Sequence, residues 1–293
     1  MPVSMSPVRP PLSAAAAAKR AFAGELLLFP PAPEMRRLLA CVRRIARESF
    51  AAKEPVRAHL QYSRAEFLRR AETAQKRVNS PECKPLFAAV LDAAGVGQKN
   101  MFWDTLGLRV APPVADAAEL AKRGFRSHAV VHRDTWGAGM QAQINWWAPV
   151  WPLTARRTLA FYPSYWTRPL ANTTAEWSFK EFLASRKQSA GGRAAAYPAA
   201  PLAAAKPDET AAPVLPKPGE LLCFSAAHLH GSVLNATALT RFSLEIRTLH
   251  LDDLRQKRGA PNVDCESRTP LVGLFSAISG GAPLKQYWTA ETQ

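Results

Sequence analysis

Apolar side chains recur at helical spacing through much of the first hundred residues. Between Glu34 and Phe50 they occur every three or four positions, with arginines between them, which is typical of an amphipathic helix with a basic outer face. Ser63-Arg-Ala-Glu66 is typical of a capping box, because each side chain can bond the other's free backbone N–H. The pattern predicts a short strand over 25–29 and helices over 34–50, 63–77 and 85–94.

From about Asn100 the pattern changes to short runs rich in β-branched and aromatic residues, separated by glycine and proline. Strands at irregular spacing after a helical opening favour a β-sandwich or jelly roll backed by helices. The predicted fold class is therefore mainly β with flanking helices. The predicted strands cover 101–110, 127–134, 140–150, 158–162, 220–225 and 240–250.

The length of 293 residues suits one large domain, which we expect over 25–293. Residues 1–24 contain five consecutive alanines and no acidic residue, and we expect a flexible leader there rather than a targeting peptide. The Ala- and Pro-rich stretch 185–218 is expected to be a long loop, either a lid or disordered. The divisions expected within the domain are mainly helical support over 25–99, a core over 100–250 and a C-terminal wrap over 251–293.

The chain is strongly basic, with 38 Lys and Arg against 23 Asp and Glu, a net charge of +15. Such a charge favours anionic partners without choosing among phosphates, carboxylates, acidic surfaces and nucleic acid. The four cysteines lie far apart and form no CxxC pair, so neither a structural zinc site nor a dense disulfide framework is expected, and a cytoplasmic location is predicted. No apolar run approaches 18 residues, which excludes a membrane span.

Among the six histidines, His132 lies two residues before Asp134. Residues two apart on a strand face the same side, so this pair could hold one metal ion. Two further histidines, His228 and His230, follow the strand predicted over 220–225, and strand parity would place them on one common face. Two histidines and one carboxylate form the facial triad of non-haem Fe(II) oxygenases, which leaves three coordination positions open. A 2-oxo acid would fill two of these positions and O2 the third.

The strand predicted near the C-terminal end of the core has one apolar face and one charged face. Arg241, Ser243, Glu245 and Arg247 alternate with apolar residues, so their face either lines a polar cavity or meets solvent. In a cavity, Arg241 would suit the far carboxylate of a 2-oxo acid, because a guanidinium binds a carboxylate through two parallel hydrogen bonds.

Together these residues resemble the Fe(II)/2-oxoglutarate-dependent oxygenases, most closely their phytanoyl-CoA and ectoine hydroxylase branch. The likeness covers about 100–250 and lies in the order His132-Arg-Asp134, His230 and then Arg241 eleven residues later. The segments that carry it further are His230-Gly-Ser-Val-Leu-Asn-Ala-Thr-Ala-Leu-Thr-Arg241, Thr158-Leu-Ala-Phe-Tyr-Pro-Ser-Tyr165, in which Ser-Tyr replaces the family's Gly-Ser, and Asn145-Trp146-Trp-Ala148.

The resemblance implies a double-stranded β-helix, a cupin-like jelly roll, with Fe(II) held by His132, Asp134 and His230. The spacing to Arg241 favours His230 over His228 as the third ligand, which leaves His228 a structural role. The resemblance further implies that 2-oxoglutarate is anchored by Arg241 and contacted by Ser232, Ser243 and Trp146. It also implies hydroxylation, or else desaturation or ring formation, rather than chlorination, because related halogenases lack the carboxylate that Asp134 supplies. Candidate substrate contacts are Arg247, Gln143 and Asn145. The sequence leaves open whether Arg247 instead pairs with Glu245 or another acid, and whether the two amides face the cavity or solvent.

The predicted substrate is a small, anionic metabolite such as an amino acid or natural-product intermediate. One alternative is oxidative demethylation of alkylated nucleic acid, because Arg241 and Arg247 match that group's Arg-x5-Arg spacing. Ser243 and Glu245 stand where that group has Asn and Thr, however, and the segment from His230 to Arg241 is too short for it. A second alternative is a non-enzymatic jelly-roll binding protein, which would show neither stoichiometric Fe(II) nor succinate release.

Overall fold

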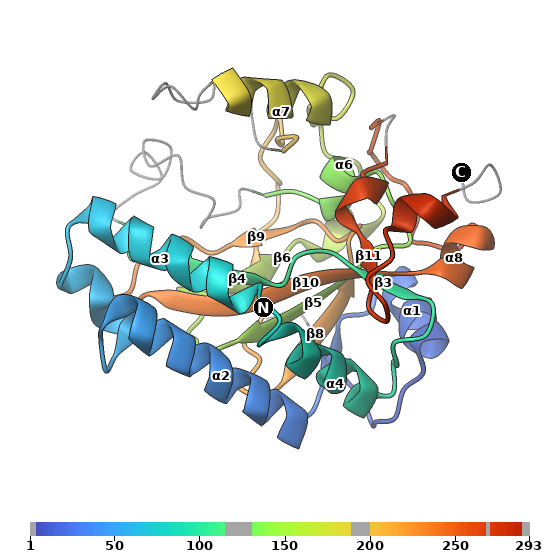
Figure 1. Cartoon of the computed structure of the whole chain (residues 1–293). Coiled ribbons are helices and arrows are strands. Elements are labelled where there is room, and N and C mark those ends of the chain that lie inside the picture. The colour runs from blue at the N-terminus through green and yellow to red at the C-terminus, as the bar shows by residue number, and fades with distance from the viewer. Residues whose placement is uncertain (1–3, 115–130, 189–199, 268–269, 289–293) are drawn as a thin grey trace.

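The computed structural model describes residues 4–114, 131–188, 200–267 and 270–288 (Figure 1). Most of the described helices precede the main strands in sequence, as predicted. The helices are α1 (Ala14–Phe22), α2 (Pro33–Phe50), α3 (Arg64–Val78), α4 (Lys84–Ala94), α6 (Asp134–Ala138), α7 (Phe179–Gln188) and α8 (Leu251–Arg255), with 3-10 turns η1 (Pro55–Leu60), η2 (Pro163–Trp166), η4 (Val272–Leu274) and η5 (Leu284–Tyr287). No described helix is both long enough and apolar enough to cross a bilayer.

The described strands form two sheets. The large sheet runs in the spatial order β1-β2-β8-β5-β10-β3-β11, with β4 also paired to β10, and the small sheet runs β7-β6-β9. Their bounds are β1 (Ser6–Pro7), β2 (Leu27–Phe29), β3 (Met101–Trp103), β4 (Gly107–Ala111), β5 (Ile144–Pro149), β6 (Leu159–Phe161), β7 (Ala212–Pro213), β8 (Leu221–Ser225), β9 (His230–Ser232), β10 (Arg241–His250) and β11 (Ser276–Ala277).

The long strand β10 organises the large sheet. It pairs with β5 along one edge and with β4 and then β3 along the other. Phe242, Leu244 and Ile246 on one face of β10 join the main apolar core, whereas Arg241 and Arg247 on the other face line a cavity between the sheets. The predicted alternation of this strand is therefore confirmed, and its polar face meets a cavity rather than bulk solvent.

Helices α2, α3 and α4 cover the apolar face of the large sheet and lie together at the front and lower left of Figure 1. Leu38, Phe67 and Leu91, one from each helix, pack in the same buried cluster as Phe242 of β10. Ser63 caps α3 by accepting a hydrogen bond from the Glu66 backbone N–H at 3.3 Å. These contacts bury the apolar stripes that the helical spacing predicts.

The opposite face of the large sheet packs against the small sheet. Trp147 and Phe224 of the large sheet meet Leu159 and Phe161 of β6 in a second buried cluster. The result is an open two-sheet sandwich flanked by helices. This arrangement confirms the predicted fold class of a mainly β, jelly-roll-like core.

Parts of the chain expected to be irregular are ordered. Residues 4–24, expected as a flexible leader, contain β1 and α1, and Ala17, Ala18 and Ala21 are buried. The expectation of a flexible leader is therefore wrong for these residues, because alanine favours helix and its small side chain allows close packing on the sheet. Helix α7 occupies the start of the stretch expected as a loop over 185–218, and 189–199 lie outside the described residues. The other expected domain divisions stay predictions.

The strand predicted over 127–134 is wrong where it is described. Residues 127–130 lie outside the described part, His132 forms an isolated bridge to His230, and α6 begins at Asp134. The backbone N–H and carbonyl of His132 both pair with His230, and a helix begins two residues later. The segment Val131–Asp134 therefore forms a bridge and a helix start rather than a continuous strand.

Candidate metal centre

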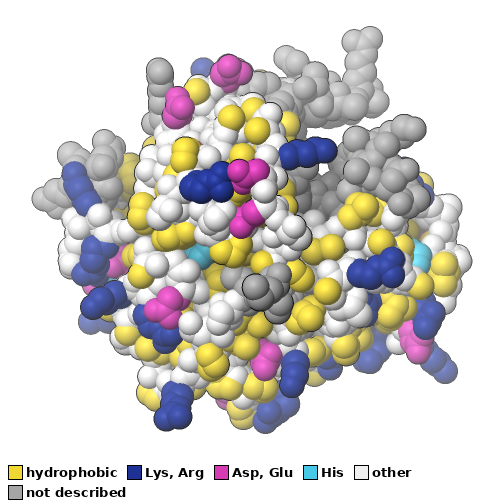
Figure 2. Space-filling view, turned by 180° about the vertical axis from the view of Figure 1, so that it is seen from behind, with side chains coloured by type: hydrophobic (Ala, Val, Ile, Leu, Met, Phe, Trp, Pro, Cys, Tyr) yellow, Lys and Arg dark blue, Asp and Glu magenta, His cyan; other side chains and the backbone are white. Residues whose placement is uncertain are grey.

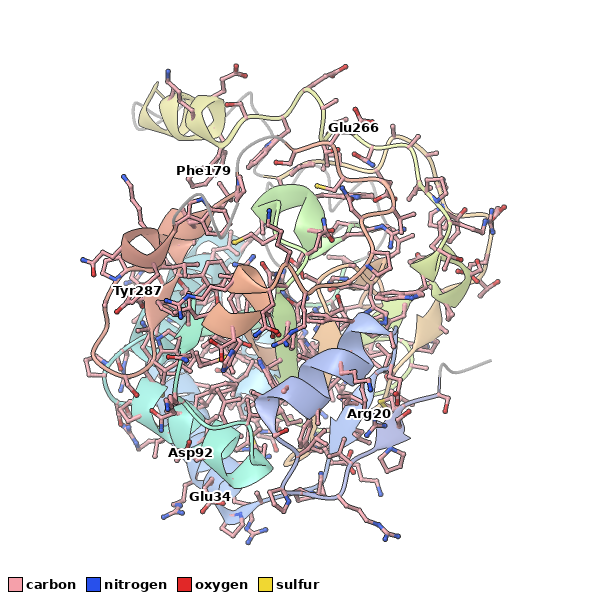
Figure 3. The ribbon with its side chains drawn as sticks, turned by 90° about the vertical axis from the view of Figure 1, so that its right-hand side faces the viewer. Arg20, Glu34, Asp92, Phe179, Glu266 and Tyr287 are labelled. Carbon is pink, nitrogen blue, oxygen red and sulfur yellow. The ribbon has the colours of Figure 1, made fainter. Side chains whose placement is uncertain are left out.

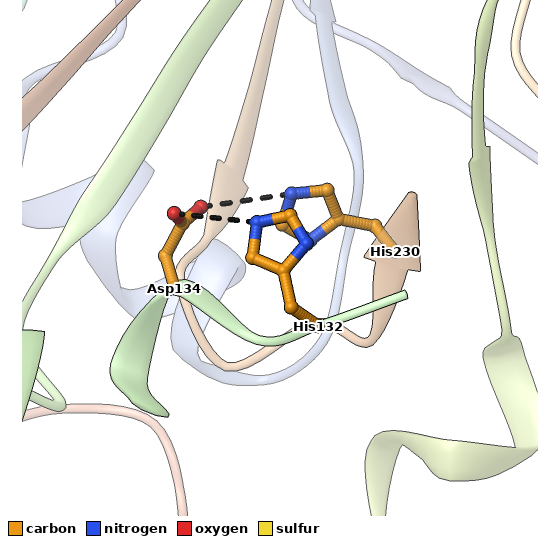
Figure 4. Close-up of side chains that lie close together, drawn as sticks. All are labelled: His132, Asp134 and His230. Atoms are coloured by element: carbon orange, nitrogen blue, oxygen red, sulfur yellow. Dashed lines mark ion pairs between the residues drawn. The ribbon is translucent and has the colours of Figure 1, made fainter. Parts of the chain in front are cut away.

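Three side chains from two parts of the chain that are about a hundred residues apart converge at one point (Figure 4). The ligand atoms that His132, Asp134 and His230 offer lie within 4.8 Å of one another. His132 Nε2 is 3.7 Å from Asp134 Oδ1, and His230 Nε2 is 3.6 Å from Asp134 Oδ2. The structure thus brings together the two imidazoles and the carboxylate that the sequence singled out.

Backbone hydrogen bonds hold the two histidines side by side. The His132 N–H donates to the His230 carbonyl at 2.9 Å, and the His230 N–H donates to the His132 carbonyl at 3.0 Å. Their ring centroids lie 4.5 Å apart. Asp134 reaches the same point from the first turn of α6, so a bridge and a helix start replace the single strand face that we expected.

The environment of His230 fixes which ring nitrogen points at Asp134. Its Nδ1 lies 2.9 Å from the carbonyl oxygen of His228, so Nδ1 carries the proton and Nε2 keeps its lone pair toward the other two side chains. Burial and the neighbouring His132 lower the pKa of His230 to about 4. A neutral imidazole with a directed lone pair is the form that binds metals.

Asp134 is held ionised and oriented by its neighbours. Burial by itself would raise its pKa, but His132, His230 and Arg247 together hold the pKa of this carboxyl well below its usual range. Asn145 Nδ2 donates to Asp134 Oδ2 at 2.5 Å, and Gln143 Nε2 donates to Asn145 Oδ1 at 3.0 Å. The two amides, predicted as substrate contacts, therefore form a chain that orients the carboxylate.

His228 lies apart from the three converging residues. Its Nδ1 is 3.0 Å from the Ser225 carbonyl oxygen, its Nε2 is 3.1 Å from the Gly24 carbonyl oxygen, and its ring packs against Trp166. The expectation that His228 shares a strand face with His230 is wrong, because His228 lies in the turn before β9 begins. Its position agrees with the structural role preferred from the sequence.

A cavity of about 140 Å³ lies between the two sheets beside the three converging residues. Its lining includes His132, Asp134, His230, Ser232 and Arg241. The small sheet supplies Ser232 from β9, and the large sheet supplies Arg241 from β10. We call this space the inner cavity.

Arg241 is a buried cation in the inner cavity, with 2% of its surface exposed. It donates to the Thr158 carbonyl and to Ser232 Oγ, each at 2.8 Å, and its Nε has no partner among the described residues. No described carboxylate lies within ion-pair distance of it. Burial and the charge of Arg109 lower the pKa of Arg241 to about 9, so an anion placed here would relieve its unfavourable burial.

The other two predicted contacts of the co-substrate differ in position. Ser243 lies on the polar face of β10 and is fully buried. Its Oγ has no hydrogen-bond partner among the described residues. Trp146 packs in the helix-facing core beside Phe29 and donates from Nε1 to Thr248 Oγ1 at 2.8 Å. Trp146 is nevertheless among the residues that line the inner cavity, so its contact with the co-substrate stays a prediction. Trp147, one residue later, lies between the sheets, because successive side chains of a strand alternate between faces.

Two ion pairs lie beside the cavity. Arg109 of β4 binds both carboxylate oxygens of Glu245, at 2.9 and 2.6 Å. Arg247 binds Asp104 through its side chain and its backbone N–H, and its Nη1 is 3.9 Å from Asp134 Oδ1. The sequence showed Glu245 and Arg247 on one face but gave no signal for Asp104 or Arg109, whose positions depend on strand pairing.

A second cavity, of about 440 Å³, adjoins the inner one, and we call it the outer cavity. Both cavities are lined by Arg109, His132, Asp134 and Arg247, so two of the three converging residues border both cavities, whereas His230 lines the inner cavity alone. A still larger cavity of about 740 Å³ is lined by other residues, including Met140 and Trp288, and by none of the three. The candidate metal centre thus faces a small polar space on one side and a larger space on the other.

No protein-family model and no curated protein sequence matches the chain. Several solved structures resemble it remotely. One is the non-heme monooxygenase ThoJ, with 17% identity over 80% of this chain and 77% of that chain and a TM-score of 0.43. Another is EvdO2 from Micromonospora carbonacea var. aurantiaca, with 14% identity over 85% of this chain and 94% of that chain and a TM-score of 0.46. A third is the epimerase SnoN, in a complex with Fe3+, alpha ketoglutarate and nogalamycin RO, with 15% identity over 81% of this chain and 85% of that chain and a TM-score of 0.42. None of the three is described as a phytanoyl-CoA or ectoine hydroxylase, and at this distance the function has to be argued from the chain's own residues.

Proposed function

We propose that this protein is a non-haem Fe(II)- and 2-oxoglutarate-dependent dioxygenase that oxidises a C–H bond of a small molecule. The observation that carries the proposal is the convergence of His132, Asp134 and His230 at the junction of two cavities. One of these cavities contains a buried guanidinium that has no carboxylate partner among the described residues.

The three side chains fit an Fe(II) ion by their chemistry. Two neutral imidazoles and one carboxylate are the donor set of the facial triad, which would leave coordination positions open for further ligands. His230 offers Nε2 because its Nδ1 is occupied by the His228 carbonyl, and Asp134 is ionised and oriented by Asn145. When bound, Fe(II) would supply the redox chemistry by which O2 oxidises 2-oxoglutarate to succinate and carbon dioxide and a substrate C–H bond is oxidised.

Arg241 and Ser232 fit the far carboxylate of 2-oxoglutarate. Both line the inner cavity, whose volume of about 140 Å³ suits a compact acid rather than a large metabolite. Arg241 has an Nε–H without a partner among the described residues, and Ser232 Oγ already accepts from Arg241 and can donate its own proton to an anion. The Ser243 hydroxyl, for which the described part of the chain offers no hydrogen-bond partner, supports the same role by its position on the polar face of β10.

The finer sequence predictions stay proposals. They are membership of the phytanoyl-CoA and ectoine hydroxylase branch, hydroxylation as the outcome, and a small metabolite as the substrate. The presence of Asp134 beside both imidazoles supports hydroxylation over chlorination, because the carboxylate occupies the position that a halide would need.

The two alternatives gain no support from a specific observation. For nucleic acid, Arg247 is already bound to Asp104, and on the face shown in Figure 2 the Lys and Arg side chains are spread out among acidic and apolar ones. A non-enzymatic binding protein would not need two imidazoles and an ionised carboxylate that converge beside two cavities. We therefore retain the oxygenase proposal.

The proposal is tested by anaerobic titration with Fe(II) and 2-oxoglutarate, following the visible charge-transfer band of the chelate. We expect one Fe(II) per chain and a band in the wild type, and neither in Asp134→Ala. Asp208→Ala is the matched control, because Asp208 is an exposed carboxylate paired with Arg168. A wild-type protein that binds Fe(II) no more tightly than Asp134→Ala would refute the assignment.

A further inference from the structure

The outer cavity has apolar walls from two segments distant in sequence. Phe179 and Phe182 come from α7, and Leu271 and Phe275 flank η4 from the C-terminal part of the chain. Figure 3 shows Phe179 on the side of α7 that faces the rest of the molecule. The rings of Phe179 and Phe182 lie 6.1 Å apart, and Phe179 is 6.2 Å from Trp177, so the helix presents an aromatic surface to this space.

The positive charges in the lining of the outer cavity are already paired. Arg109 binds Glu245 at 2.6 Å and Arg133 binds Asp264 at 3.0 Å. Arg247 binds Asp104. Among the described lining residues, every arginine therefore has a carboxylate partner. An anionic group entering here would have to compete with a carboxylate already in place, unlike an anion entering the inner cavity at Arg241.

One buried polar side chain in the lining has an acceptor without a donor among the described residues. Gln143 lines the outer cavity and is fully buried, and its Oε1 accepts no hydrogen bond from the described residues. Its Nε2 is occupied by Asn145, which fixes the orientation of the amide. A buried carbonyl oxygen without a donor is costly, so a ligand that brings an O–H or N–H here would be favoured.

We propose that the outer cavity binds an uncharged, mainly apolar substrate that carries a ring system and a hydrogen-bond donor. This inference rests on the proposed function and replaces the expectation of an anionic metabolite. Aromatic walls pack well against flat ring surfaces, and a volume of about 440 Å³ lies within the range of drug-sized ligand sites, roughly 300–1,000 Å³. The net positive charge of the chain would then play no part in selecting the substrate at this cavity.

The test uses two fluorescent ligands on the metal-free protein: neutral N-phenyl-1-naphthylamine and its sulfonated relative 8-anilinonaphthalene-1-sulfonate. For Phe182→Ala we expect the neutral ligand to bind about tenfold more weakly, the loss expected for the apolar area of one phenyl ring. The sulfonated ligand should change by less than about twofold. Phe179→Ala, whose ring is only partly buried, should weaken the neutral ligand in the same direction without disturbing the core.

Trp288→Ala is the control, because Trp288 lines the separate cavity of about 740 Å³. The inference is overturned if both Phe variants bind the neutral ligand like the wild type, or if the sulfonated ligand is the one that loses affinity. These outcomes are independent of the Fe(II) titration. A charge-transfer band without the Phe effect would refute only this inference, and the Phe effect without a band would refute only the oxygenase proposal.

Discussion

Asn145 donates a hydrogen bond of 2.5 Å from Nδ2 to Oδ2 of Asp134, the carboxylate oxygen that also faces His230. The two residues belong to different elements, β5 and the start of α6. Gln143 donates to Asn145 Oδ1, and this contact settles which end of the Asn145 amide meets the carboxylate. The carboxylate of the candidate metal centre is thus held from a rigid central strand as well as from its own backbone.

This contact predicts that Asn145→Leu weakens metal binding without removing a ligand. Loss of a neighbour that orients a ligand typically lowers metal affinity about 10- to 100-fold. We expect a loss in this range for Fe(II), measured by anaerobic calorimetry, with the overall fold retained by circular dichroism. Gln98→Leu is the control, because Gln98 is a partly exposed amide that bonds Asp92 and lines neither cavity. Equal Fe(II) affinity in wild type and Asn145→Leu would show that the hydrogen bond does not position Asp134.

Replacement of Arg241 is predicted to weaken the binding of 2-oxoglutarate specifically. Arg241→Lys keeps the charge but loses the planar pair of donors, so we expect 2-oxoglutarate to bind about 10- to 100-fold more weakly, a loss of roughly 1.4–2.8 kcal/mol. The measurement is the rise in melting temperature that the co-substrate causes in the presence of Mn(II), which grows with the ratio of ligand concentration to Kd. Arg168→Lys, at an exposed ion pair, should respond like the wild type. An unchanged shift in Arg241→Lys would exclude Arg241 as the anchor.

The Arg247–Asp104 pair is predicted to stabilise the fold more than a surface pair does. Asp104 is only 3% exposed and accepts from both the backbone and the side chain of Arg247, although the Arg247 side chain is 40% exposed. In a double-mutant cycle with Asp104→Asn and Arg247→Met, we expect a coupling free energy of unfolding of about 1–3 kcal/mol.

The exposed pair Arg168–Asp208 is the matched comparison, with an expected coupling below about 1 kcal/mol. Urea unfolding of the wild type, the two single variants and the double variant of each cycle gives the two coupling free energies. Equal coupling in the two pairs would mean that burial of Asp104 adds nothing to the Arg247 contact.

The burial of His228 predicts that the folded protein loses stability on mild acidification. Burial lowers its pKa to about 4, outweighing the two backbone carbonyls that would favour a proton. Since an unfolded histidine titrates near 6.5, the unfolded chain takes up a proton between pH 6.5 and 4 while the folded chain does not. The contribution of His228 is therefore complete above pH 6.5 and is lost as the pH falls toward 4. The difference corresponds to roughly 3 kcal/mol.

The measurement is the free energy of unfolding of chelator-treated protein from pH 7 to 4.5. His230 contributes in the same direction, because its pKa is also lowered to about 4. We expect His228→Gln to reduce the pH slope by about one proton, or about 1.4 kcal/mol per pH unit where that proton binds. A slope identical to that of the wild type would mean that His228 does not stay neutral in the folded protein.

Much of the site could be predicted because its residues are distinctive in type and spacing. The sequence singles out His132, Asp134, His230 and Arg241 by type and spacing, and the alternation along β10 indicates that Arg241 and Arg247 share a face. For Trp146 and Trp147 the sequence could not choose a face, because adjacent side chains of a strand point to opposite sides and nothing in the sequence shows which side is the inner one.

The sequence by itself determined the helical opening, the mainly β core and the identity of the candidate ligands, because these depend on local periodicity and on the chemistry of single side chains. Only the tertiary structure decided which side chains orient the candidate ligands and which arginines lack a carboxylate partner among the described residues. Asn145 reaches Asp134 across two elements, and Arg109 and Arg247 meet Glu245 and Asp104 across strands that are more than a hundred residues apart in sequence. Such contacts depend on strand order and register, which arise from packing of the whole sandwich and leave no signal in any short stretch of sequence.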